Sequence, residues 1–200
     1  MVRETCDFCL REKKWNTLIQ DKVLESFTPR IRDDLQSINI RIDNRYLKQI
    51  LEHGSLMIGG SGTGSGKTLF ACKIMFDVMK GSFIEQLGFK KCLFVPLPDL
   101  LEKLRKSYYD EGFYPLFFED HINADLLVLD DIGAEQVTDW VLEKIYQLVN
   151  HRYEFLLPTI FTSNLTGKEL ANRLGDRIVS RIEQMSMAVK LKNIDHRLHG

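Results

Sequence analysis

Short apolar runs alternate along the chain with longer segments in which apolar residues recur every three or four positions. The short runs predict strands at residues 56–58, 91–95, 125–129 and 158–161, and a last extended piece at 187–191. The segments with helical spacing predict helices at about 67–80, from Asp99 onward, and at 137–152, 167–173 and 176–183. Strands that alternate with helices indicate an α/β fold, with a parallel sheet and helices on both faces.

Apolar spacing also predicts which helix faces are buried. Helical spacing over residues 31–51 predicts one or two helices before the first strand, and Pro29 separates them from the preceding residues. The helix after the second strand should bury Leu97, Leu100, Leu101, Leu104 and Tyr108. The helix over 137–152 should bury Val137, Val141, Ile145, Leu148 and Val149.

The strongest chemical signal is a glycine-rich run, Gly-Gly-Ser-Gly-Thr-Gly-Ser-Gly-Lys-Thr over residues 59–68, between a predicted strand and a predicted helix. Its end fits the P-loop, in which backbone N–H groups and a helix N-terminus surround phosphate groups. Lys67 is expected to reach the β- and γ-phosphates, and Thr68 to bind Mg²⁺. The predicted nucleotide-binding residues are Ser61, Gly62, Thr63, Gly64, Ser65, Gly66, Lys67 and Thr68.

One position of this loop departs from the G-x-x-x-x-G-K-[ST] pattern. Ser61 stands where the pattern has its first glycine. Either serine serves at that position, or Gly60 takes its place in a loop that is one residue wider. A flexible linker that happens to contain Gly-Lys-Thr is the alternative, which the flanking strand and helix oppose.

The third predicted strand ends in two carboxylates, Asp130 and Asp131. An apolar strand delivers its last residues to the carboxyl edge of a parallel sheet, where ligands bind in open α/β folds. We expect Asp130 to hold Mg²⁺, directly or through water, and Asp131 to orient the attacking water as a base. Paired acids at a strand end are also common in turns, but the upstream P-loop favours the functional interpretation.

The fourth predicted strand ends in Thr-Ser-Asn, again a buried run followed by small polar groups. Asn164 is expected to hydrogen-bond the γ-phosphate or the attacking water, and so to respond to an intact nucleotide. The alternative is that Asn164 caps the helix that begins near Gly167.

Arginines beyond the last predicted helices are further candidates. Arg177 and Arg181 are four residues apart, which places them on one helical face. Arg181 is a candidate finger for the ATP of a neighbouring subunit, whereas a solvated ion-pair edge with Asp176 and Glu183 is the alternative for Arg177. Arg197 is expected to contact the γ-phosphate in cis, with a simple basic tail as the alternative.

The order of these motifs resembles a known family. The P-loop, Leu-Val-Leu-Asp-Asp-Ile-Gly-Ala-Glu, Thr-Ser-Asn-Leu and Arg-Ile-Val-Ser-Arg-Ile are similar to the AAA+ ATPases of the DnaC/DnaI helicase-loader and IstB transposition-helper group, over about residues 56–197. The resemblance implies Walker A at Lys67 and Thr68, Walker B at Asp130 and Asp131, sensor 1 at Asn164, the arginine finger at Arg181 and sensor 2 at Arg197.

The resemblance also implies an architecture and partners. The expected fold is a P-loop NTPase sheet of the AAA+ type with a reduced or absent lid, because few residues follow Arg181. Residues 1–50 are predicted to be a short helical partner-binding or linker segment, and residues 51–200 the ATPase core. Members of the group assemble as ATP-dependent spirals and bind single-stranded DNA, so ATP, Mg²⁺, self-association and single-stranded DNA are implied here.

Charge and composition narrow these expectations. The chain has 27 Lys and Arg against 28 Asp and Glu, which argues against a surface coated with positive charge. A local basic strip remains open, for which the candidate is the helix with Lys103, Arg105 and Lys106, and a solvated helix face is the alternative. No apolar run is long enough for a membrane span and no signal-peptide core is present, which predicts a cytoplasmic protein without membrane contact.

The 4 cysteines are then expected to be thiols. Cys6 and Cys9 resemble half of a zinc site, but no second pair follows them in the N-terminal segment, whereas Cys72 and Cys92 fit the core.

Three functions remain as hypotheses. The first is an ATP-dependent loader that assembles on single-stranded DNA and delivers a replicative helicase. The second is an IstB-like helper of a transposase, which uses the same ATPase for a different client. The third is a nucleotide-gated adaptor with little turnover, for which the departure at Ser61 is the supporting feature.

Overall fold

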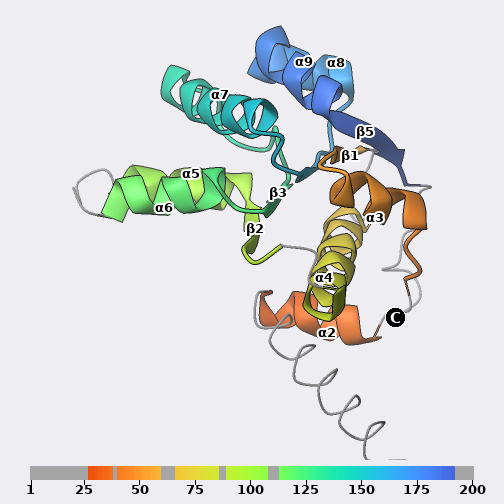
Figure 1. Cartoon of the computed structure of the whole chain (residues 1–200). Helices are drawn as coiled ribbons and strands as arrows, with labels where there is room; N and C mark the ends of the chain where they lie inside the picture. Colours follow the sequence, from red (N-terminus) through yellow and green to blue (C-terminus); the bar gives the residue numbers. More distant parts are fainter. Residues whose placement is uncertain (1–26, 38–39, 60–65, 86–88, 108–112, 192–200) are drawn as a thin grey trace, which may run out of the picture.

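A computed structural model describes residues 27–37, 40–59, 66–85, 89–107 and 113–191 (Figure 1). Its sheet has the order β2-β3-β4-β1-β5, and every neighbouring pair is parallel. The strands are β1 (Ser55–Gly59), β2 (Cys92–Pro96), β3 (Leu126–Asp130), β4 (Thr159–Thr162) and β5 (Ser186–Lys190). The parallel α/β sheet predicted from the apolar pattern is thus confirmed.

Helices cover both faces of the sheet (Figure 1). On one face lie α2 (Pro29–Ser37), α3 (Asn44–Leu51) and α4 (Lys67–Glu85). The other side has α5 (Leu97–Ser107), α6 (Phe113–Ile122), α7 (Asp139–Glu154), α8 (Gly167–Leu174) and α9 (Asp176–Met185). Both faces are covered, which explains why the first four residues of β3 are an apolar run and why every residue of the strand is buried.

Side chains that alternate along the strands divide the core into two apolar clusters. Leu56, Ile58, Leu126, Val128, Ile160 and Val189 pack toward α4. Leu127, Leu129 and Phe161 pack toward α5, α7 and α9. The period of two in side-chain direction therefore supplies both faces from the same short strands.

The helices depart from the sequence-based prediction in several places. Residues 31–51 form two helices, and α4 extends to Glu85. Helix α6 was not predicted, because its apolar residues are consecutive over 113–118 instead of recurring every three or four positions, and because it contains Pro115. Proline is tolerated in the first turn of a helix, where its missing N–H would have no helical partner.

Val137 is also a correction, because its side chain is 38% exposed rather than buried. Thr138 caps α7 by accepting a hydrogen bond from the Val141 amide, so Val137 precedes the helix. The other four predicted inward residues of α7 are buried, namely Val141, Ile145, Leu148 and Val149. Cys72 and Cys92 are buried free thiols, as expected.

A buried arginine lies at the amino edge of the sheet, where the strands begin. The Arg152 side chain is fully buried and donates hydrogen bonds to Thr159 Oγ1 and to backbone carbonyls that precede β3 and β4, those of His121, Ile122, Ala124 and Pro158. Burial lowers the pKa of Arg152 to about 9, which leaves the guanidinium charged at neutral pH. Arg152 thus ties α7 to the starts of two strands.

Several expectations fall outside the described residues. Leu191 is the last of them, so the expectation of a reduced or absent lid is not tested, and Arg197, Cys6 and Cys9 are not described. The predicted boundary at residue 50, between an N-terminal segment and the ATPase core, stays a prediction. Helices α2 and α3 pack in the same apolar cluster as α4. Within the described ranges, no helix combines the length and apolar character needed to cross a membrane.

Candidate functional site

The carboxyl ends of β3 and β4 meet the start of α4 at a cluster of hydroxyl and carboxylate groups. Thr162 Oγ1 donates to Asp130 Oδ1 at 2.6 Å, and Thr68 Oγ1 donates to Asp130 Oδ2 at 3.0 Å. Each oxygen of Asp130 therefore accepts a hydrogen bond from a threonine. The strand register makes this possible, because β3 and β4 are neighbours and both residues end their strands.

Asp131 follows directly and is held in an unusual backbone conformation. Its φ of 59° lies in the left-handed region, which is uncommon for a residue with a side chain. The Asp131 amide donates to Thr162 Oγ1 at 2.9 Å, and Asn164 Nδ2 donates to Asp131 Oδ1 at 2.8 Å. The sheet edge thus fixes both the backbone and the carboxylate of Asp131, as is common where strain serves a site.

Lys67 is the first residue of α4 and follows Gly66, whose φ is 74°. Its side chain is only 6% exposed. Burial lowers the pKa of the Lys67 ammonium, and the charges of Asp131 and Asp130 oppose this shift. A cation at the N-terminus of a helix, where backbone N–H groups point outward, suits an anionic ligand such as a phosphate.

Burial also dominates the electrostatics of Asp130. It raises the pKa of this carboxyl group, while the hydrogen bonds from Thr162 and Thr68 act in the opposite direction. Carboxylate and hydroxyl oxygens are suitable ligands for Mg²⁺, which usually takes one or two protein carboxylates together with phosphate oxygens and water. The described residues contain no group of three or more His, Cys, Asp or Glu suited to a metal.

Glu135 was not among the site residues predicted from the sequence, because a glutamate in a loop is usually exposed. It is 6% exposed, and its Oε2 accepts a hydrogen bond from the Gly133 amide at 3.0 Å. Arg173 Nη2 of α8 donates to the Glu135 backbone carbonyl at 2.5 Å. Glu135 Oε1 is buried and has no hydrogen-bond partner in the described part of the chain. Burial raises the pKa of Glu135, and this residue with Arg173 fixes the loop that follows Asp131.

The structure brings together five of the predicted site residues: Lys67, Thr68, Asp130, Asp131 and Asn164. It excludes the helix-capping alternative for Asn164, because Thr166 caps α8 and forms a capping box with Glu169. Ser61–Ser65 lie outside the described residues, so the departure at Ser61 is not tested. Thr162, which was not among the predicted site residues, connects the two aspartates.

Arg181 is not part of this cluster. It lies on α9, and its contacts are with α7 and with its own helix. Arg177 stacks on Tyr146, with its Cζ atom 4.0 Å from the ring centroid. That contact replaces the ion-pair edge with Asp176 and Glu183 that was the alternative interpretation for Arg177.

The helix considered for DNA contact, α5, has a mixed surface. Lys103, Arg105 and Lys106 are exposed. Lys106 pairs with Glu102, and the Arg105 guanidinium lies 5.3 Å from the Trp140 ring centroid. A role of α5 in DNA binding therefore stays a prediction.

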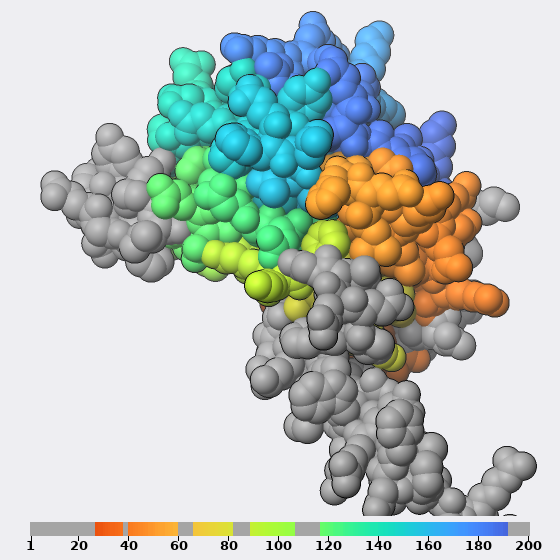
Figure 2. All heavy atoms as spheres, viewed as in Figure 1, coloured from red at the N-terminus to blue at the C-terminus, as the bar shows by residue number. Residues whose placement is uncertain are grey.

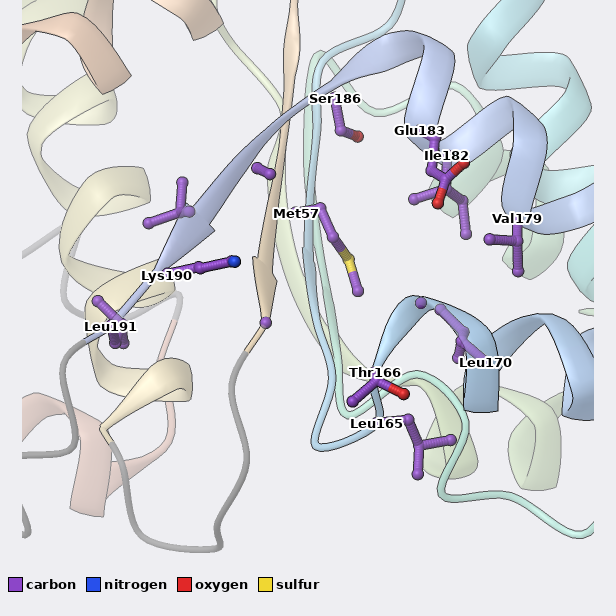
Figure 3. A pocket seen from close by; sticks show the side chains of 14 residues that line it. Met57, Leu165, Thr166, Leu170, Val179, Ile182, Glu183, Ser186, Lys190 and Leu191 are labelled. Carbon is purple, nitrogen blue, oxygen red and sulfur yellow. The ribbon is translucent and has the colours of Figure 1, made fainter.

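A cavity of about 700 Å³ lies between the β1/β5 edge of the sheet and helices α8 and α9 (Figure 3). Its walls are mainly apolar, with Met57, Leu170 and Ile182 among them. Gly59, which leads into the glycine-rich run, also lines it, whereas Lys67 and Asp130 do not. The cavity is therefore distinct from the polar cluster.

Fold and site together define a class of protein, the P-loop ATPases of the AAA+ type, in which a phosphate-binding strand–loop–helix unit lies beside an acidic strand end. Within this class the chain belongs to the family of IstB-like ATP binding proteins, whose profile matches residues 10–199. Binding of a nucleotide is the property that this membership supports.

Individual relatives agree with this assignment. The chain is 30% identical over 112 residues to the replicative helicase loader DnaI of Bacillus subtilis, which covers 54% of this chain and 32% of DnaI. It is 33% identical over 172 residues to the phage-like element PBSX protein XkdC of the same organism, with 79% of this chain and 59% of XkdC covered. The chain thus spans from about a third to three fifths of these relatives.

A solved structure gives the same result. The crystal structure of the DnaC helicase loader superposes with a TM-score of 0.61 at 28% identity, and the match covers 84% of this chain and 96% of that chain.

Proposed function

We propose that the chain binds ATP with Mg²⁺ at the polar cluster and hydrolyses it. The observation that supports this most strongly is the hydrogen-bonded set of Thr68, Asp130, Thr162, Asp131 and Asn164 at the start of α4. It combines a hydroxyl, a metal-binding carboxylate, a second carboxylate and an amide at one edge of the sheet.

Each side chain then has a role. Lys67 and the amide groups of residues 61–66 bind the phosphates, and Thr68 and Asp130 hold Mg²⁺. Bound Mg²⁺ supplies neutralisation of the charge that develops on the transferred phosphoryl group. Asp131 orients the attacking water and accepts its proton. Asn164 holds the Asp131 carboxylate and hydrogen-bonds the γ-phosphate or the attacking water.

We also propose that the chain acts as an assembly. Arg181 contributes to the ATP of a neighbouring subunit, and Arg197 contacts the nucleotide of its own subunit. The helicase loaders among the relatives support delivery of a replicative helicase to single-stranded DNA in the cytoplasm, with residues 1–50 as the partner-contacting segment. ATP binding promotes assembly in this mechanism, and hydrolysis reverses it.

A second candidate client is a transposase. The family profile, which bears the IstB name and matches residues 10–199, favours it. The ATPase chemistry is the same in both cases, so the two functions differ only in the partner.

Nucleotide measurements test the proposed chemistry. We expect Lys67→Ala to abolish ATP binding in a fluorescent-nucleotide titration, whereas Asp131→Asn binds ATP but hydrolyses it at least about 100-fold more slowly. Lys168→Ala, an exposed lysine on α8, is the matched control. Normal ATP binding with background hydrolysis in the wild-type chain, with and without single-stranded DNA, would contradict the ATPase and favour a nucleotide-gated adaptor.

A loading assay tests the client. We expect the chain and ATP to increase the retention of a closed-ring replicative helicase on circular single-stranded DNA. Stable binding to a transposase with no effect on the helicase would instead support the IstB-like function.

A further inference from the structure

Helices α7 and α9 pack side by side (Figures 1 and 2), and the Arg181 side chain of α9 contacts α7. Arg181 Nε donates to Asn150 Oδ1 at 2.6 Å, and Nη1 donates to the Arg177 carbonyl at 3.2 Å. The Arg181 side chain is half-buried. Its guanidinium is therefore anchored at one edge, and no hydrogen bond of Nη2 is found within the described ranges.

Asn150 is itself oriented by neighbours on α7. Its Nδ2 donates to Glu154 Oε1 at 2.9 Å, and the Tyr146 hydroxyl donates to its Oδ1 at 3.2 Å. Since the Glu154 carboxylate accepts only from the N–H side of the amide, the carbonyl oxygen of Asn150 is directed to Arg181. The acceptor for Arg181 is thus fixed before any partner binds.

Tyr146 provides a second support. Its ring centroid lies 5.0 Å from the Arg181 Cζ atom and 4.0 Å from that of Arg177, within the range of cation–π attraction. The Tyr146 hydroxyl also accepts a hydrogen bond from Arg177 Nη2. The ring of Tyr153 lies 5.9 Å from Arg181 on the same helix.

We propose that Asn150 and Tyr146 are positioning residues that hold the Arg181 guanidinium ready for the triphosphate of a neighbouring subunit. The inference rests on the proposed function, because it requires Arg181 to act in trans. A long arginine side chain loses much rotamer freedom when it is immobilised, and a cradle that orders it before assembly removes that cost from the assembly step. Anchoring Nε and one Nη1 hydrogen leaves the Nη2 side of the guanidinium for phosphate oxygens.

Asn150→Leu is the central variant, because leucine keeps the side-chain size and removes the acceptor. We expect kcat for ATP hydrolysis to fall about 10- to 100-fold. Nucleotide binding should stay unchanged, because ATP is bound by the P-loop of its own subunit and the neighbouring Arg181 acts on the charge that develops in the transition state. Asn150→Asp keeps an acceptor oxygen for Arg181 Nε but loses the N–H that donates to Glu154, so its kcat should lie between those of Asn150→Leu and the wild type. Tyr146→Phe, which keeps the ring and loses the hydroxyl, should give an intermediate value.

Mixed assemblies separate positioning from a structural defect. Asp131→Asn subunits have an intact Arg181 cradle but an inactive site of their own, so mixing them with Asn150→Leu subunits should restore hydrolysis at the mixed interfaces. Wild-type kcat in both Asn150→Leu and Tyr146→Phe would overturn the inference. If Asn150→Leu does not fold, as judged by circular dichroism, then wild-type kcat in Tyr146→Phe alone overturns it.

Arg181→Ala identifies which proposal has failed. Wild-type hydrolysis by Arg181→Ala would refute the trans role of Arg181, and with it the inference. Loss of hydrolysis in Arg181→Ala, together with wild-type kcat in both cradle variants, would refute only the positioning by α7.

Discussion

The two edges of the sheet each bury a charged side chain, but they satisfy it differently. At the amino edge, Arg152 donates to four backbone carbonyls and to the Thr159 hydroxyl. At the carboxyl edge, Asp130 accepts from the hydroxyls of Thr68 and Thr162. Strand β4 contributes to both, with Thr159 at its start and Thr162 at its end.

The difference indicates that the charge of Arg152 stabilises the fold, whereas the charge of Asp130 is suited to binding a ligand. Arg152 is surrounded by backbone acceptors that cannot rearrange without moving strands. The partners of Asp130 are two side-chain hydroxyls that rotate easily, and each carboxylate oxygen keeps lone pairs for a further ligand. A buried carboxylate that accepts its hydrogen bonds from side-chain hydroxyls, with the Lys67 ammonium nearby, is thus suited to a cation that comes and goes.

The largest expected effect is at the amino edge. Arg152→Leu leaves several buried carbonyls without a donor, so we expect the free energy of unfolding to fall by about 3–5 kcal/mol. Urea unfolding followed by circular dichroism measures this, with Arg30→Ala, an exposed arginine on α2, as the control. An unfolding midpoint equal to that of the control would show that the amino edge does not depend on this charge.

At the carboxyl edge the expected effects on stability and activity have opposite directions. Asp130→Asn should reduce ATP hydrolysis at least about 100-fold, because a metal-binding carboxylate is lost. The free energy of unfolding of the nucleotide-free protein at pH 7 should not decrease. Steady-state hydrolysis and urea unfolding of the same preparation test both statements, and a loss of stability as large as that of Arg152→Leu would erase the distinction between the edges.

The pH dependence gives a second test of Asp130. Burial raises the pKa of this group above its ordinary value of 3.8, so the folded chain holds the proton more tightly than the unfolded chain. The protonated Asp130 carboxyl group therefore contributes to stability below pH 3.8, and this contribution is lost as the pH rises through the raised pKa. The stability of Asp130→Asn relative to the wild type should thus grow as the pH rises above 3.8, and a difference that stays constant with pH would contradict the assignment.

A smaller effect concerns the loop after Asp131. Gly133 has a φ of 93°, and a Cβ there would lie 2.7 Å from Leu165 Cδ1 and 2.9 Å from Leu170 Cδ1. Gly133→Ala should therefore cost about 1–3 kcal/mol in unfolding free energy. Gly175 has a similar φ of 88° but open space at its Cβ position, so Gly175→Ala isolates the backbone strain. Equal losses in the two variants would show that the contacts with Leu165 and Leu170 add nothing.

Much of the fold follows from patterns within short stretches of sequence. The alternation of apolar runs with helical spacing predicts the parallel sheet, and the carboxyl ends of β3 and β4 predict that Asp130, Asp131 and Asn164 meet. Helix α6 has no such pattern, because its apolar residues are consecutive over 113–118 and its polar residues follow together at 119–121. Hydrophobic periodicity predicts a helix only where one face of that helix is polar.

The parts of the site that sequence does not predict depend on contacts between distant residues. Thr162 links the two aspartates only because β4 is the neighbour of β3, which no single segment encodes. Glu135 is buried, and its backbone carbonyl accepts a hydrogen bond from Arg173, 38 residues later in the chain. Likewise Asn150 and Arg181 meet only through the packing of α7 against α9.

The strand order has a consequence for biosynthesis. Strand β1, which leads into the glycine-rich run, pairs with β4 and β5 and with neither of the strands that follow it directly. While a ribosome makes the chain from its N-terminus, about half of the sequence is made between β1 and β4, the first of its neighbours, whereas β2 and β3 can pair earlier. The nucleotide-binding half of the sheet is therefore completed last, after the strand that supplies the acidic residues.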